Sequence, residues 1–127
     1  MKPETEEWLE KAEGDWKVAV RERGAADPVW SVICFLAQQC AEKYLKAYLE
    51  ERNIAFRKTH DLVALYSLAS EQLAVLEPFA SELAVLSTIG AAVRYPGALA
   101  DREAADDAIR ISGEVRAAIA HKLGIEV

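Results

Sequence analysis

The chain has 127 residues, of which 52% are hydrophobic and 28% are charged. This composition excludes a disordered tail, and the length suits one hydrophobic core, so we expect a single domain over residues 1–127. The net charge of −6 opposes unaided binding along a nucleic acid, because such binding relies on Lys and Arg neutralising phosphates. No apolar run approaches the roughly 20 residues that cross a bilayer, and the first residues do not resemble a signal peptide. We therefore expect a cytoplasmic protein without membrane contact.

Apolar residues recur at spacings of three and four along most of the chain, which predicts amphipathic helices and no sheet. The first helix is expected over residues 3–23, with Gly24 ending it. The second is expected over residues 27–52, with Asp27 as its N-cap and Pro28 in its first turn. Because the second helix is apolar on nearly all sides, we expect it at the centre of the fold.

Three further helices are expected in the second half of the chain. The third covers residues 62–73, the fourth covers residues 79–93, and the fifth begins at an Asp101 cap and ends at Gly124. A Tyr-Pro-Gly turn at residues 95–97 ends the fourth helix, because proline lacks a donor and restricts the residue before it. The sequence therefore predicts an all-α fold, a four- to five-helix antiparallel up-and-down bundle.

One sector of the second helix is polar although the rest of that helix is apolar. This sector carries Gln38, Gln39, Glu42, Lys43 and Lys46. Burying such groups without partners would cost several kcal/mol, so they need partners in the fold or in a ligand. The alternative is a solvated edge with local ion pairs.

A second unusual position is the exit of the fourth helix, where Arg94 and Tyr95 precede a rigid turn. A fixed guanidinium offers a planar fork of donors that suits phosphate or carboxylate. The alternative is an arginine that faces the helix dipole, with Tyr95 packed on the end of the bundle. We expect Arg94 to pair with Glu42, so that Gln39, Glu42, Lys43, Lys46, Arg94 and Tyr95 together form a ligand-binding cleft. No catalytic residue, metal site or cofactor site is predicted.

Four segments in order resemble the HEPN family (higher eukaryotes and prokaryotes nucleotide-binding). They are the Trp- and Ala-rich residues 8–20, the Gln-Gln-x-x-Glu-Lys-x-x-Lys-Ala run at 38–47, the His-Asp-Leu opening at 60–62, and Arg-Tyr-Pro at 94–96. The resemblance covers essentially the whole chain. It implies a helical bundle, a homodimer, and pairing with a small nucleotidyltransferase in a toxin–antitoxin arrangement.

Many HEPN proteins are metal-independent ribonucleases whose signature is an arginine followed, after four to six residues, by a histidine. Here the positions after Arg94 hold Leu99, Ala100 and Asp101, so the expected general acid or base is missing. We therefore predict a nucleotide- or RNA-related binding or accessory protein. Two alternatives remain: an endoribonuclease that uses Tyr95 or a histidine brought in by folding, and a purely structural interaction module.

The two histidines lie away from Arg94 in the sequence. His60 either joins a basic patch with Arg52, Arg57 and Lys58, or, together with Thr59, caps the third helix. His121, in the last turn of the fifth helix, suits the negative end of the helix dipole.

Overall fold

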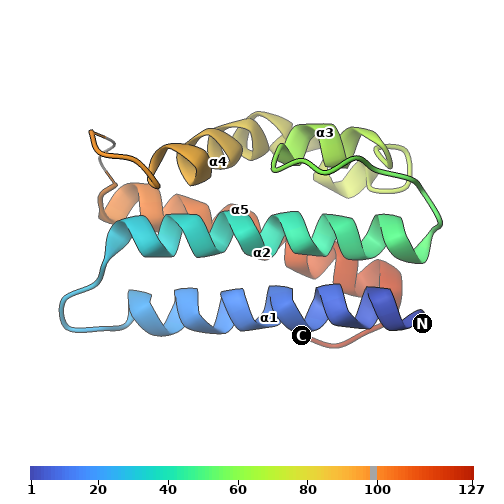
Figure 1. Cartoon of the computed structure of the whole chain (residues 1–127), viewed down its shortest axis with the longest axis horizontal. Helices are drawn as coiled ribbons and strands as arrows, with labels where there is room; N and C mark the ends of the chain where they lie inside the picture. The colour runs from blue at the N-terminus through green and yellow to red at the C-terminus, as the bar shows by residue number, and fades with distance from the viewer. Residues whose placement is uncertain (98–99) are drawn as a thin grey trace.

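A computed structural model describes residues 1–97 and 100–127. These residues form five α-helices and one 3₁₀ helix (Figure 1). Their bounds are α1 Pro3–Arg23, α2 Trp30–Glu51, α3 Leu62–Ser67, η1 Ala74–Phe79, α4 Ala80–Ala92 and α5 Arg102–Leu123. The all-helical prediction is confirmed.

Helix α2 is the centre of the bundle, as its apolar character predicts. It packs against α1 and α5 over most of its length, and it also contacts α3 and α4. Figure 1 shows α1 and α2 running antiparallel side by side, α5 behind them, and α3 and α4 on the opposite side of α2 from α1. Thirteen residues of α2 are buried, including Tyr44, Tyr48 and the free Cys34 and Cys40.

Two predicted helix ends carry the expected caps. Gly24 caps α1 through backbone bonds, and Gly124 ends α5 in the left-handed conformation with φ 70°. The Asp101 side chain accepts a hydrogen bond from the backbone N–H of Ala104, which defines the start of α5.

The predicted start of the second helix is wrong. Helix α2 begins at Trp30, after Val29, which has no side-chain cap. The Val29 N–H donates instead to the Glu22 carboxylate at 2.9 Å. Neither Asp27 nor Pro28 therefore starts the helix.

The predicted cap of the third helix is also wrong. The Asp61 side chain caps α3 by accepting hydrogen bonds from the backbone N–H groups of Val63 and Ala64. Neither Thr59 nor His60 has this role.

The third helix is shorter than its apolar spacing predicts. It ends at Ser67 rather than near Leu73, and turns lead into η1, which includes Pro78. Leu73 and Leu76 are buried nonetheless. The leucine spacing therefore indicates which residues are buried against the bundle. It does not indicate the helix type, because a turn and a 3₁₀ helix can bury these leucines as well as an α-helix.

Helix α4 lies on the outside of the bundle although most of its residues are apolar. The stretch Ala74–Ala92 has mean hydropathy 1.3 and is long and apolar enough to cross a membrane, which corrects the expectation of no such run. Core helices of soluble proteins can have the same length and composition. Only 22% of this stretch is buried, so most of it faces outward.

Candidate functional site

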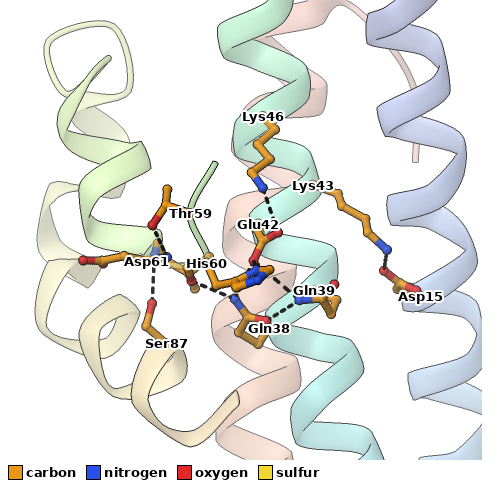
Figure 2. A network of polar contacts seen from close by, with 11 residues as sticks. Asp15, Gln38, Gln39, Glu42, Lys43, Lys46, Thr59, His60, Asp61 and Ser87 are labelled. Carbon is orange, nitrogen blue, oxygen red and sulfur yellow. Dashed lines mark hydrogen bonds and ion pairs between the residues drawn. The ribbon is translucent and has the colours of Figure 1, made fainter. Parts of the chain in front are cut away.

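Glu42 is a carboxylate enclosed by the fold, with a side chain only 4% exposed. Its Oε2 accepts a hydrogen bond from Lys46 Nζ at 3.0 Å. Its Oε1 lies 2.9 Å from His60 Nδ1 and 3.2 Å from the Gln38 amide nitrogen (Figure 2). Both oxygens therefore have partners, as a buried charge requires.

These partners decide the ionisation of Glu42. Burial alone would raise the pKa of its carboxyl group, but hydrogen bonds from Lys46, His60 and Gln38 outweigh burial, and the pKa is lowered. Glu42 is therefore charged at neutral pH. Because an ionised carboxylate can only accept, the His60 Nδ1 must carry a hydrogen and donate it.

His60 belongs to the connector between α2 and α3, and this connector is hydrogen-bonded to α2 and α4. The His60 backbone carbonyl accepts from the Gln38 amide of α2 at 3.1 Å. Two residues later, the N–H of Leu62 donates to Ser87 Oγ of α4 at 2.8 Å. The imidazole side chain is 62% exposed while its carboxylate partner is buried. The His60 ring is therefore held on one side by the Glu42 carboxylate (Figure 2) and is largely exposed to solvent elsewhere.

The two lysines of the polar sector point in different directions. Lys46 is buried beside Glu42, and its Nζ also lies 5.4 Å from the centre of the Trp8 ring. Lys43 points toward α1, where its Nζ lies 2.6 Å from the Asp15 carboxylate (Figure 2). Lys46 therefore supports the buried network, whereas Lys43 joins two helices.

An open hollow of about 580 Å³ lies over His60 and the exposed side of α4, and we call it the His60 hollow. Its polar lining comes from α2, the connector, α4 and the turn that follows α4: Gln38, His60, Asp61, Ser87, Thr88, Arg94 and Tyr95. The side chain of Tyr95 is 69% exposed. The Arg94 guanidinium carbon lies 5.0 Å from the centre of the Phe35 ring, a cation–π contact that holds the cation at the hollow.

The predicted cleft is therefore only partly formed. Arg94 and Tyr95 do share a hollow with residues of the Glu42 network, but the expected Glu42–Arg94 ion pair is wrong, because Lys46 and His60 occupy the carboxylate. Gln39 donates to the Gln38 side chain at 2.8 Å and so supports the network from one side. Of the residues predicted for the cleft, Gln39, Glu42, Lys43 and Lys46 do not line the hollow, and Lys43 is paired with α1 instead.

Sequence reasoning missed Gln38 and His60 as site residues. Gln38 is one turn before Glu42, a spacing that indicates a shared helix face. His60 is 18 positions from Glu42, and no local pattern indicates that the connector folds back over α2. Leu99, one of the positions where a ribonuclease histidine is expected, lies outside the described residues.

The hollow combines three kinds of chemistry. Arg94 supplies a fixed cation with a fork of donors, which suits an anionic oxygen. His60 supplies an imidazole whose second nitrogen can accept or donate a proton, oriented by a charged carboxylate. Tyr95 supplies an exposed aromatic ring. This set suits a ligand that carries both a phosphate group and a base.

The sequence matches the HEPN domain family over residues 5–122. The chain belongs to the HEPN domain family. Two solved structures are similar along nearly their whole length. TT1696 from Thermus thermophilus is 23% identical with a TM-score of 0.81, covering 95% of this chain and 99% of that chain. ST0689, an archaeal HEPN homologue, is 26% identical with a TM-score of 0.72, covering 97% and 99%.

A comparison with curated protein sequences finds no significant match. Family membership and the shared fold therefore indicate a HEPN-type protein. The His60 hollow adds the chemistry that belongs to this chain.

Proposed function

We propose that this HEPN protein binds a nucleotide or a segment of RNA, with a phosphate group seated in the His60 hollow. The observation that carries this proposal is the placement of His60 and Arg94, 34 positions apart in the sequence, around one hollow. Phosphate binding in proteins commonly uses a guanidinium fork together with a second donor. The HEPN family supports the same ligand class.

We further propose that the protein works beside a minimal nucleotidyltransferase in a cytoplasmic toxin–antitoxin pair. Family membership supports this part of the proposal. Co-expression with a nucleotidyltransferase encoded next to it, followed by size-exclusion chromatography, tests it. A stable co-eluting complex supports the pairing, and separate elution at micromolar concentration contradicts it.

The binding proposal is tested by titrating labelled nucleotides and short single-stranded RNA into the purified protein. Arg94→Ala should weaken binding by about tenfold or more, because a hydrogen bond to a charged group is worth about 1.5–3 kcal/mol. Arg21→Ala is the matched control, since that arginine is exposed on α1 and does not line the hollow. Equal affinities for the Arg94 variant and the wild type would exclude the hollow as the site.

A second candidate function is metal-independent cleavage of RNA. It is favoured by the Glu42–His60 pair, because an imidazole oriented by a carboxylate beside a fixed arginine can accept the proton of a ribose 2′-hydroxyl. Here His60, from the connector before α3, would replace the histidine missing after Arg94. Incubation with labelled single-stranded RNA tests this function. Cleavage lost in His60→Ala and retained in His121→Ala would support it.

We propose, finally, that two copies associate through the side of α4 that borders α5. The residues that line the groove between these two helices are mainly apolar, and one of them, Val85, is 56% exposed. The α4 residues of the His60 hollow, such as Ser87 and Thr88, do not line this groove. A second copy of the chain would cover the groove.

A further inference from the structure

The charges around the His60 hollow limit how many phosphate groups it can hold. Among the described residues that line it, Arg94 is the one cation and Asp61 the one anion, and the His60 imidazole lies beside them. The whole chain carries a net charge of −6. An RNA strand bound along its backbone needs several cations in a row, one for each phosphate neutralised. This hollow instead suits a single phosphate group.

A terminal phosphate suits the donors of the hollow. Arg94 supplies a guanidinium fork, and His60, whose Nδ1 donates to Glu42, has its second ring nitrogen free for a ligand. The Glu42 charge is itself neutralised by Lys46 at 3.0 Å. A phosphomonoester offers three oxygens that are not bonded to carbon, whereas an internal phosphodiester offers two. The monoester therefore has more oxygens than the diester with which to contact both side chains at once.

The remaining lining residues suit a nucleoside attached to that phosphate. Asp61 uses Oδ1 to cap α3, which leaves Oδ2 to accept from a sugar hydroxyl. The exposed Tyr95 ring offers a face on which a base can stack. The Asp61 charge also repels any further phosphate. A volume of about 580 Å³ lies within the range of small-molecule sites.

We propose that the His60 hollow is specific for the terminal phosphate of a nucleoside phosphomonoester, held by Arg94 and by the His60 imidazole that Glu42 orients. This inference rests on the proposed nucleotide- or RNA-binding function and narrows its ligand. The phosphomonoester can belong to a free mononucleotide or to the 5′ end of an RNA.

The test compares four probes by isothermal titration: 5′-AMP, adenosine, and one short RNA with either a 5′-phosphate or a 5′-hydroxyl. The phosphorylated member of each pair should bind about tenfold or more tightly, since its phosphate adds charge-assisted hydrogen bonds to the Arg94 guanidinium and a contact with the His60 imidazole. The difference should disappear in Arg94→Ala and shrink in His60→Gln, and it should remain in Arg21→Ala. Arg94 is exposed, so its removal leaves the fold intact.

The four probes separate failure of this inference from failure of the proposed function. If both RNAs bind equally and Arg94→Ala weakens both, the function stands and the monoester specificity is overturned. If no probe binds in an Arg94-dependent manner, both are overturned. Tighter binding of 5′-AMP than of the 5′-phosphorylated RNA assigns the hollow to mononucleotides, and the reverse order assigns it to RNA ends.

Discussion

The buried Glu42 carboxylate neutralises the positive charge of Lys46, whose side chain is also buried. Replacing this carboxylate by a neutral amide would leave Lys46 Nζ, in a side chain 6% exposed, without its ion-pair partner. We predict that Glu42→Gln lowers the free energy of unfolding by about 3 kcal/mol, because breaking a buried pair leaves an uncompensated charge. Urea denaturation measures the change. Asp106→Asn breaks an exposed pair with Arg23 and should leave the free energy of unfolding nearly unchanged. Equal losses in the two variants would contradict a buried network.

The same carboxylate makes stability depend on pH in the acid range. The pKa of Glu42 is lowered in the folded state, so its contribution is fully present above the unfolded value of about 4.3 and is lost as pH falls through the folded pKa. We predict that the difference in free energy of unfolding between the wild type and Glu42→Gln is largest near pH 7 and shrinks toward pH 3. Subtraction removes the effect of other carboxyls with lowered pKa values, such as Glu13 beside Arg116. A constant difference across this range would refute the prediction.

At the scale of single residues, the sequence predicts part of the site and leaves the rest to tertiary structure. Glu42 and Lys46 are four positions apart on one helix, so their pairing follows from helical geometry alone. The contact between Glu42 and His60 depends on how the connector returns over α2, which no local spacing encodes. The expected Glu42–Arg94 pair assumed that two conspicuous charges satisfy each other. Nearer donors and the Phe35 ring satisfy them instead.

Contact between helices α2 and α4 depends on the absence of a side chain at Gly90. A Cβ added there would lie 2.6 Å from Gln38 Cβ, closer than real side chains approach. We predict that Gly90→Ala destabilises the fold by about 1–3 kcal/mol, since overpacking forces the two helices apart or displaces Gln38 from the Glu42 network. Thermal unfolding followed by circular dichroism measures this.

The matched control for Gly90 is Gly14, an exposed glycine within α1 with open space around its would-be Cβ. Gly14→Ala should stabilise the protein by about 0.5–1 kcal/mol, because alanine favours helix over glycine. Opposite signs for the two substitutions are the expected result. Two stabilising substitutions would mean that α2 and α4 do not approach closely at Gly90.

At the scale of elements, helices with strong end signals were predictable and irregular segments were not. The bounds of α1 and the caps of α5 follow from glycine and aspartate at defined positions. The start of α2 was misplaced because Asp27 and Pro28 belong to the preceding turn, where they have the same local preferences as in a cap. The end of α3 was missed because leucine spacing reports burial whichever helix type or turn provides it.

At the scale of the whole molecule, the exposed face of α4 should be an interface between two copies. A groove of about 240 Å³ runs between α4 and α5, lined mainly by apolar residues and flanked by the Glu82–Arg110 ion pair. Helices η1 and α4 together extend about 30 Å. A face of that length and two helices wide covers about 600 Å² per copy, which reaches the lower end of the range for stable complexes.

We predict that the wild-type chain sediments as a dimer and that Val85→Asp converts it to a monomer, because a charge would be buried at the centre of the apolar face. Analytical ultracentrifugation at micromolar concentration measures the change. Val18→Asp is the control, since Val18 is a similarly exposed valine on α1 at the opposite side of the bundle. If the wild type is a dimer that Val85→Asp leaves intact, another face joins the copies and α4 remains open to a different partner. A monomeric wild type would remove the dimer from the proposal altogether.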